Sequence, residues 1–300
     1  MSEYGYRLGL DLGGTKIAAV VLDFNGQAVW QQRVPTPQHD YLATLDAVAA
    51  LVEEAETIVG HRCRVGIGMP GAISPATGLV KNANSTWLIG QPFREHIENR
   101  LGRDVQVEND ANCLAMSEAT DGAAAGADVV FAVILGTGVG GGLVVGGHVV
   151  TGANAIGGEW GHNPLPWPDT EELPGPACYC GLQGCLETWL SGPGLAADYV
   201  RRGGETLSGE AIVARRDAGE DLARTTVDAW TSRLARGLAS VVNVIDPHVI
   251  VIGGGLSRIA SIYEDVPRLW ANWVFSDHIA TRLVPAQYGD ASGVRGAAWL

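Results

Sequence analysis

The hydrophobic positions in the first third of the chain predict strands that alternate with helices. Arg7 to Asp11 is a short, largely apolar run, and a second run from Ile17 to Leu22 leads into Asn25-Gly26, a dipeptide typical of tight hairpins. Ala28 to Val34 is the third predicted strand. A helix follows, because apolar side chains recur at helical spacing from Tyr41 to Ile58. This order of elements is typical of an α/β fold.

Two more strands and two more helices are predicted before residue 121. The strands are Arg64 to Met69 and Val105 to Glu108, and a helix lies between them from Pro92 to Leu101. The second strand delivers Asn109-Asp110 to the start of a helix that runs to about Glu118. Polar side chains therefore stand at the junction of a strand and a helix.

After a segment rich in Ala and Gly, residues 121–128, the opening pattern returns. A strand, a glycine turn, a strand and a hairpin follow one another as they do in Leu8 to Gly26, with Gly136 aligned on Gly13. The matching segments are Phe131–Leu135, Gly136-Thr137-Gly138, Leu143–Val145 and Gly146-Gly147. We therefore predict an internal duplication, with two similar α/β domains of residues 1–120 and 121–291 facing one cleft.

The rest of the chain completes the larger second domain. A helix is predicted to start at Ser191-Gly-Pro193, where cap and proline take their favoured places. The other predicted elements are helices over Leu222–Ile245 and Val266–Val274, strands over Val249–Ile252 and Arg282–Val284, and a final helix from Ser292.

Composition narrows the expected function. The 300 residues carry a net charge of -13 without any basic run, so nucleic acid is not an expected partner. The 41 glycines indicate many tight turns and close backbone approaches. An acidic chain that binds anions must do so with backbone amides and a metal ion.

The sequence also favours a cytoplasmic protein. No apolar run reaches membrane-spanning length, and the first residues lack the basic and apolar regions of a signal peptide. The five cysteines are an odd number, and three of them cluster, which suits a reducing compartment better than a disulfide framework. We expect neither a membrane nor an extracellular partner.

Four soft ligands with short spacings predict a zinc site. The ligands are His162, Cys178, Cys180 and Cys185, which is the number that a closed tetrahedral site requires. Gly181 and Gly184 let the two cysteine loops curl, and the acids Glu159 and Glu187 flank the block. The ion would fix the positions of these acids as well as the loop. Either the metal only stabilises the structure, or the loop that it stabilises also binds a polar ligand.

Glycine turns follow three predicted strands. Backbone N–H groups that converge at such turns bind phosphate oxygens, although each turn could also be a plain hairpin. The turns comprise Gly13, Gly14, Thr15 and Lys16, then Gly136, Thr137 and Gly138, and finally Gly253, Gly254 and Gly255, which permit close approach by a flat ligand such as adenine. Gly136 to Gly141 also satisfies the dinucleotide fingerprint, but a strand rather than a helix follows it, which excludes that interpretation. The chain contains no Walker A motif.

Two aspartates end strands where chemistry is expected. Asp11 precedes the first glycine turn. Mg²⁺ bound to its carboxylate, directly or through water, would offset the cost of burying that charge. Alternatively, the Asp11 carboxylate caps its own turn. Asp110 stands at a helix N-terminus, whose field favours the ionised form, and is a candidate general base or a helix cap. Glu159, Glu187 and Asn109, with His162, offer the paired hydrogen bonds that a polyol requires.

Together these motifs resemble the ROK family (repressor, open reading frame, kinase) over the whole chain. The motifs, in family order, are Asp11-Leu-Gly-Gly-Thr-Lys16, Glu108-Asn-Asp-Ala-Asn112, Gly136-Thr-Gly-Val-Gly140, Glu159-Trp-Gly-His162, Cys178-x-Cys180-Gly-x-x-Gly-Cys185-x-Glu187 and Gly253-Gly-Gly-Leu-Ser257. The resemblance implies a duplicated, actin-like (ribonuclease H-like) fold with ATP and sugar in its cleft. It also implies structural zinc at the four soft ligands, Asp110 as base, Mg²⁺ with ATP, and a last helix, 292–300, that packs back on the first domain.

Within the family, the chain looks most like bacterial fructokinases of the mannofructokinase type. The likeness rests on Lys81 to Trp87, Gly161 to Trp167 and the Ala-rich segment. It predicts D-fructose as substrate, phosphorylated on its 6-hydroxyl, with Trp87 and Trp167 narrowing the pocket or simply packing. N-acetylglucosamine kinases and kinases of glucose or mannose are the alternatives. The expected substrate-binding residues are Asn84, Asn109, Asp110, Glu159, His162 and Glu187.

Two other classes are less favoured by the sequence. A non-enzymatic sugar-sensing regulator would carry a DNA-binding segment ahead of the first strand, where only about six residues stand. A phosphate-hydrolysing ATPase of the actin-like superfamily would not need the stapled loop. A homodimer is the family's usual assembly.

Overall fold

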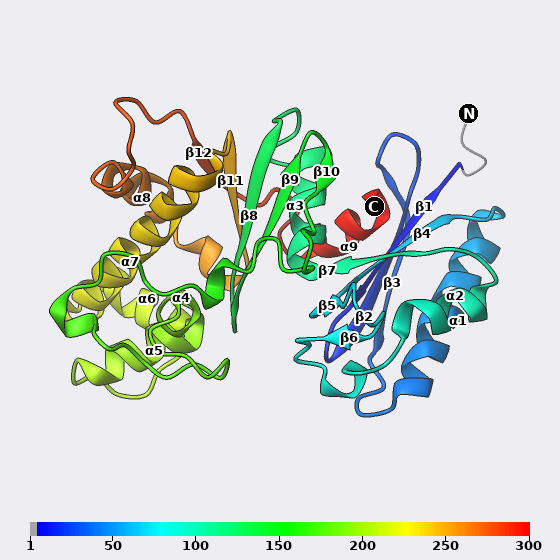
Figure 1. Ribbon diagram of the computed structural model, residues 1–300, viewed down its shortest axis with the longest axis horizontal. Coiled ribbons are helices and arrows are strands. Elements are labelled where there is room, and N and C mark those ends of the chain that lie inside the picture. Colours follow the sequence, from blue (N-terminus) through cyan, green and yellow to red (C-terminus); the bar gives the residue numbers. More distant parts are fainter. Residues whose placement is uncertain (1–4) are drawn as a thin grey trace. The chain divides into compact units, whose positions relative to one another are not determined.

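The computed structural model describes residues 5–300, and the chain forms two compact units. The first comprises the chain up to Gly126 together with Gly142–Gly157 and Asp290–Leu300, and the second comprises Ala127–Gly141 and Gly158–Gly289 (Figure 1). The sequence prediction had drawn its boundary at residue 120 and kept 121–291 together. The chain instead passes between the units at four points.

The first unit is built on a five-stranded mixed sheet. Its order is β3-β2-β1-β4-β7, with β1 antiparallel to β2 and parallel to β4. The strands are β1 (Arg7–Leu12), β2 (Lys16–Leu22), β3 (Ala28–Pro35), β4 (Arg64–Met69) and β7 (Gln106–Asn109). Asp11, near the end of β1, lies opposite Gly68 of β4. The carboxyl ends of β1, β4 and β7 therefore meet at one edge of the sheet.

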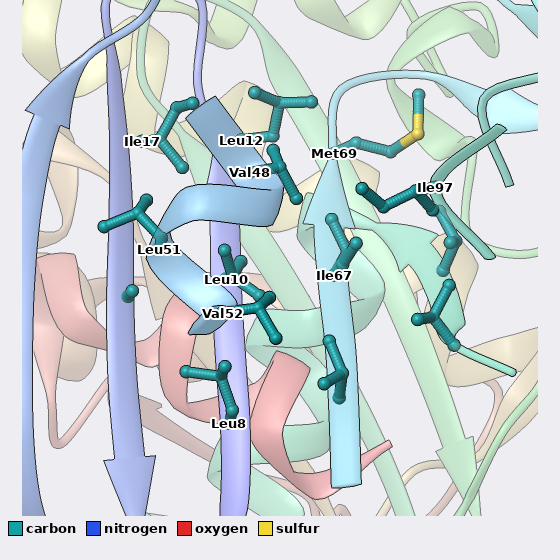
Figure 2. Close-up of a cluster of buried hydrophobic side chains, with 14 of the residues drawn as sticks. Leu8, Leu10, Leu12, Ile17, Val48, Leu51, Val52, Ile67, Met69 and Ile97 are labelled. Carbon is teal, nitrogen blue, oxygen red and sulfur yellow. The ribbon is translucent and has the colours of Figure 1, made fainter. Parts of the chain in front are cut away.

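One face of this sheet packs against two helices, α1 (Tyr41–Val59) and α2 (Phe93–Leu101). Figure 2 shows the apolar side chains of β1, β2 and β4 meeting those of the helices. Asp40 caps the start of α1, and Gly60 ends it in the left-handed conformation at φ 71°. The labelled core residues are Leu8, Leu10, Leu12, Ile17, Val48, Leu51, Val52, Ile67, Met69 and Ile97.

The other face packs against α3 (Asp110–Thr120) and α9 (Ser292–Trp299). The two helices touch backbone to backbone, because a Cβ on Gly296 would lie only 1.6 Å from the carbonyl oxygen of Cys113. A buried hydrogen bond of 2.8 Å from Ser292 Oγ to Glu118 also joins them. Residues at the far end of the sequence thus complete the first unit.

The second sheet repeats the first strand for strand. Its order is β10-β9-β8-β11-β12, and Ile134 of β8 lies opposite Gly253 of β11 as Asp11 lies opposite Gly68. The strands are β8 (Val129–Leu135), β9 (Val139–Val145), β10 (His148–Val149), β11 (Val249–Gly253) and β12 (Arg282–Pro285). The shared order is structural evidence for the duplication that the glycine turns predicted.

Helices make up the bulk of the second unit. They are α4 (Leu186–Leu190), α5 (Gly192–Arg201), α6 (Gly209–Asp217), α7 (Asp221–Ile245) and α8 (Ile262–Trp270). The sequence analysis missed α4 and α6 and started α8 at Val266. The structure starts it at Ile262, with Pro267 inside the helix, because Ile262 and Val266 bury one common face. Neither unit contains a helix within 5–300 that is long and apolar enough to cross a membrane.

Short elements complete the chain. They are strands β5 (Ala72–Ile73) and β6 (Val80–Lys81), and 3₁₀ helices η1 (Thr86–Leu88), η2 (Trp160–His162), η3 (Thr170–Glu172), η4 (Gly255–Arg258) and η5 (Gly289–Ala291).

A buried ionic network anchors η3 to α7. Arg233 bonds Glu172 at 2.7 Å and Asp198 at 2.6 Å, and Arg236 bonds Glu172 at 2.8 Å. Burial raises the pKa of Glu172, but the hydrogen bonds from the two arginines and from the Asp169 N–H outweigh it and lower the pKa to about 2. Glu172 lies between His162 and Cys178 in the sequence, so the network anchors the segment that connects two expected metal ligands.

Candidate active site and metal centre

Three cysteines and a histidine of the second unit converge on one point. Their ligand atoms all lie within 4.8 Å of one another. Cys178 Sγ is 3.6 Å from His162 Nδ1, and Cys180 Sγ is 3.6 Å from Cys185 Sγ. All three cysteines are free thiols. The structure therefore brings together the four residues that the spacing predicted.

Hydrogen-bonded turns build this cluster from a short length of chain. The Gly181 N–H donates to the Cys178 carbonyl at 3.0 Å, and the Cys178 N–H donates to Leu182 at 2.8 Å, which folds the first two cysteines onto each other. Gly184 takes a left-handed φ of 69° and leads the chain back to Cys185. A bridge between Pro164 and Cys185 then joins this loop to the segment that carries His162.

The separations in the cluster suit a tetrahedral zinc ion. Zinc bonds of about 2.3 Å to sulfur and about 2.0 Å to nitrogen put neighbouring ligand atoms about 3.5 to 3.8 Å apart. Burial, with the adjoining sulfurs of Cys180 and Cys178, raises the pKa of Cys185 to about 12, and a cation would displace that proton. Since the protein supplies all four ligands, the donor set fits a closed, structural site.

Glu187 links this loop to the second glycine turn. It lies in the first turn of α4, two residues after Cys185, and its Oε2 accepts the Val139 N–H at 2.9 Å. A Cβ on Gly138 would lie 2.7 Å from the same oxygen, so a larger residue there would displace the acid. Glu187, a candidate sugar-binding residue, is thus in direct contact with the second glycine turn, a candidate phosphate-binding segment, within one unit.

Glu159 and Tyr179 stand on the other side of the histidine. Glu159 precedes η2 and is half-buried. Tyr179 Oη lies 3.0 Å from His162 Nε2. The Tyr179 side chain itself is exposed.

The second glycine turn lies beside the start of a helix. The Gly136 N–H donates to Gly138 at 3.0 Å, and the Gly192 N–H donates to the Gly136 carbonyl at 2.8 Å. Ser191 caps α5 by accepting the Gly194 N–H at 3.1 Å. An exposed Thr137 completes the turn. The Gly192 and Gly194 N–H groups are thus already bonded and residue 193 is a proline, so the glycine turn, rather than the helix N-terminus, is the candidate phosphate site.

Gly253, Gly254 and Gly255 form a loop against the same strand end. Gly254 has φ 82°, and a Cβ there would lie 2.4 Å from the Leu135 carbonyl oxygen, so the backbone requires glycine. Leu135 immediately precedes Gly136. Two of the predicted nucleotide-binding segments are therefore adjacent in the second unit.

In the first unit, the first glycine turn keeps backbone donors available. The Gly13 N–H closes the turn on Lys16 at 3.0 Å, and Thr36 Oγ1 donates to the Gly13 carbonyl at 2.7 Å. Neither the Gly14 nor the Thr15 N–H donates to another residue of the described range 5–300. Hydrogen bonds to the carbonyl groups therefore fix the turn, while the N–H groups of Gly14 and Thr15 have no acceptor within residues 5–300.

Asp11 lies at the same turn. Burial raises its pKa, against the lowering effect of the Lys16 and Arg33 charges. No hydrogen bond or ion pair from another residue within 5–300 reaches its carboxylate. A half-buried carboxylate of this kind fits a role in holding Mg²⁺, directly or through water.

Asp110 begins α3, and its neighbours hold it in place. The helix cap is Asn109, whose Oδ1 accepts the Ala111 N–H at 2.8 Å and whose Nδ2 donates to Gly71 at 3.0 Å. Glu108 accepts hydrogen bonds of 2.9 Å from both Asn112 and Thr151. Asp110 Oδ1 also accepts the Ala111 N–H, at 2.8 Å, so both side chains bond the first turn of the helix.

The remaining predicted residues lie apart from these clusters or pack elsewhere. Asn84 is exposed on the loop before η1. The Trp87 indole donates to Thr44 Oγ1 at 3.3 Å, and Trp167 stacks on Trp273 with ring centroids 6.4 Å apart. The suggestion that these two indoles narrow a sugar pocket is therefore not supported, since each ring has a packing partner of its own.

Sequence reasoning also missed contributors to the site. Tyr179 was passed over as the variable position between two cysteines, and Gly192 was taken only as part of a helix start. Glu108 was noted only inside a motif. Its place four residues before Asn112 and its position at a strand end were signals, but its contact with Thr151 spans 43 residues and carries no local pattern.

Comparisons with known proteins decide the family. The ROK family model matches residues 7–300. The chain belongs to the ROK family. N-acetyl-D-glucosamine kinase of Yersinia enterocolitica is 40% identical over 296 residues, which cover 97% of this chain and 98% of the relative. This ROK protein therefore has the duplicated actin-like α/β fold of the family and is an ATP-dependent sugar kinase.

Solved structures agree. A ROK hexokinase from Thermus thermophilus has a TM-score of 0.86 at 35% identity, and the match covers 98% of this chain and 97% of that one. A ROK glucokinase from Streptomyces griseus, in complex with glucose and AMPPNP, has a TM-score of 0.76 at 29% identity and covers 98% of each chain. These relatives support a hexose kinase but not the expected preference for fructose.

Proposed function

We propose that this ROK protein transfers the γ-phosphoryl group of ATP to the 6-hydroxyl of N-acetyl-D-glucosamine. The observation that carries the choice of sugar is full-length similarity at 40–41% identity to several proteins that bear the name N-acetyl-D-glucosamine kinase. The fructokinase-like stretches are short, and the indoles they contain pack elsewhere. N-acetylglucosamine, initially the alternative, thus becomes the preferred substrate.

Asp110 is the proposed general base. A carboxylate on the first residue of α3 is kept ionised by the helix field, and the hydroxyl that it deprotonates becomes the nucleophile for the γ-phosphorus. Asn109 and Glu108 serve to position it. The hydroxyl proton moves to the carboxylate as the new O–P bond forms and the bond to ADP breaks.

We assign candidate sugar-binding residues in each unit separately. They are Asn84, Asn109 and Asp110 in the first unit and Glu159, His162 and Glu187 in the second. Carboxylates accept from sugar hydroxyls, and the amides both donate and accept. Glu187 has a second task, because its bond to the Val139 N–H couples the sugar ligand to the phosphate turn.

The glycine turns are the segments that we propose to bind the phosphates and the nucleoside of ATP. The turns that run from Gly13 to Lys16 and from Gly136 to Gly138 would bind phosphate oxygens, the first through the open amides of Gly14 and Thr15, and Gly253 to Gly255 would admit the nucleoside. Asp11 would hold Mg²⁺, directly or through water, and the ion would supply positive charge to the phosphates. The zinc-binding residues take no part in the chemistry; they hold the loop that carries Glu159 and Glu187.

A coupled assay of ADP release across sugars tests the proposal. The panel is N-acetylglucosamine, N-acetylmannosamine, glucose, mannose and fructose, each at saturating Mg-ATP. We expect kcat/KM for N-acetylglucosamine to exceed that for fructose by at least tenfold, or about 1.4 kcal/mol. A higher kcat/KM for fructose would reject the sugar assignment and restore the fructokinase prediction.

A further inference from the structure

A cavity of the first unit lies at the amino ends of three neighbouring strands. Its volume is about 520 Å³, which is within the range of small-molecule sites. Its lining includes the first residue of each strand, Arg7 of β1, Arg64 of β4 and Gln106 of β7. Asp11 stands near the other end of β1, and no residue assigned to the metal, the sugar or the nucleotide lines this cavity.

The pairing of β1 with β4 places two arginines side by side in the cavity. Arg7 lies directly opposite Arg64 in the parallel ladder, so both side chains project from the same face of the sheet. The Arg7 guanidinium lies over the Trp299 ring, 5.1 Å from its centroid, and this contact holds it in place. Burial and then the Arg64 charge lower the pKa of Arg7. Like charges placed directly opposite each other destabilise a sheet.

Acidic residues are plentiful in this chain, but they do not neutralise the pair. The sequence has 33 acidic residues against 20 lysines and arginines, so a lack of acids is not the reason. Within residues 5–300, neither Arg7 nor Arg64 makes an ion pair or a side-chain hydrogen bond. Asp104 also lines the cavity, yet among these residues it pairs with neither arginine. Two guanidinium groups in the cavity wall therefore lack an anion.

A third arginine adds a buried donor to the cavity. Arg103 is only 10% exposed, and its Nη1 donates to Glu56 at 2.6 Å and to the Cys63 carbonyl at 3.2 Å. Its Nε is buried and has no hydrogen-bond partner in the described part of the chain. A buried donor without an acceptor costs free energy, which an oxygen bound in the cavity would offset. Even with Glu56 and Asp104 counted, the arginines outnumber the acids here.

We propose that this cavity binds a small phosphate monoester, with its phosphate group between Arg7 and Arg64. Guanidinium groups match phosphate oxygens in bidentate geometry, and a dianion neutralises both arginines where a carboxylate would neutralise one. The polar side chain of Gln106 then faces the organic part of the ligand. The site lies apart from the residues that carry the proposed phosphoryl transfer, and the proposal does not depend on which sugar the protein phosphorylates.

The test is titration calorimetry with glycerol 3-phosphate, using glycerol as the uncharged control. Saturating N-acetylglucosamine and a non-hydrolysable Mg-ATP analogue are present, so that the probe does not enter the proposed active site. Arg64→Gln removes one guanidinium from an exposed position, and Asp104→Asn removes the opposing charge. Arg62→Gln is the matched control, because Arg62 is an exposed arginine two residues from Arg64 that does not line the cavity.

We expect the wild type to bind one glycerol 3-phosphate per chain with a millimolar or lower Kd, and glycerol not at all. Arg64→Gln should weaken this binding at least tenfold, as loss of a charge-assisted contact to phosphate would. Asp104→Asn should strengthen it, and Arg62→Gln should stay within twofold of wild type. No saturable binding to the wild type at millimolar concentrations overturns the proposal. So does an equal loss in Arg62→Gln and Arg64→Gln, because the probe would then respond only to net charge.

Discussion

Removing the charge of Glu172 tests how the zinc-binding loop is held. Glu172 is buried and accepts hydrogen bonds from Arg233 and Arg236, whose side chains are 3% and 4% exposed. Glu172→Gln keeps the volume but leaves two buried guanidinium groups with less negative charge. The shift in pKa from 4.5 to about 2 corresponds to about 3 kcal/mol of stabilisation. Breaking one partner of a buried ion pair costs about 3–5 kcal/mol, which agrees.

Thermal unfolding of wild type, Glu172→Gln and Glu171→Gln measures this effect. Glu171 is an exposed neighbour and serves as the matched control. For a chain of this size we expect Glu172→Gln to lower Tm by roughly 6–10 °C at pH 7, with Glu171→Gln unchanged. Zinc should be lost to a chelator faster from Glu172→Gln, because η3 joins the segments that carry His162 and Cys178.

The pH dependence has a definite sign. Glu172 has a lowered pKa in the folded state, so its stabilisation is complete above its ordinary value of 4.5 and is lost as pH falls toward 2. The difference in stability between wild type and Glu172→Gln should therefore shrink across that interval. A Tm of Glu172→Gln within 1 °C of wild type at pH 7, or a difference that does not change with pH, would refute the assigned role.

Three further predictions concern catalysis, metal and packing. Asp110→Asn should lower kcat by about a hundredfold or more while sugar affinity, measured by calorimetry, stays near wild type; near-normal turnover would show that Asp110 is not the base. Cys178→Ser should lose its zinc together with sugar binding, as metal analysis and titration would show, and a fully active zinc-free variant would contradict a metal-held loop. Gly296→Ala should destabilise the first unit by more than 3 kcal/mol in denaturant titration, because its Cβ would lie 1.6 Å from the Cys113 carbonyl oxygen. Gly5→Ala meets nothing within 4 Å and should be neutral.

Short sequence patterns predicted much of the fold, because the internal duplication repeats the same glycine turns and hairpins in both halves of the chain. The glycine turns after β1 and β8 and the hairpin glycines are short-range features, and they led to the shared strand order of the two sheets. The sequence analysis started α8 at Val266, whereas the structure begins it at Ile262. Burial of Ile262 and Val266 on one face decides that boundary, and burial is a tertiary property.

In the functional site too, the sequence predicted contacts between residues that are close in the chain and missed contacts between distant ones. His162 and the three cysteines were found because metal ligation demands specific residue types at short spacing. The bond from Glu187 to Val139 spans 48 residues, and the network around Glu172 spans more than 60, so no local pattern predicts either. The family's likeness at Trp87 and Trp167 suggested a pocket wall; the Trp87 indole donates to Thr44 and Trp167 stacks on Trp273, and the pocket role stays a prediction.

A competition experiment tests the central claim most directly. N-acetylglucosamine, uniformly ¹³C-labelled fructose and unlabelled glucose are mixed at equal concentrations with limiting Mg-ATP. Mass spectrometry separates the three sugar phosphates by mass. The ratio of these products reports the relative kcat/KM values of the three sugars in one reaction. The account predicts that N-acetylglucosamine phosphate exceeds each of the other products by at least tenfold. Fructose phosphate as the main product would contradict it.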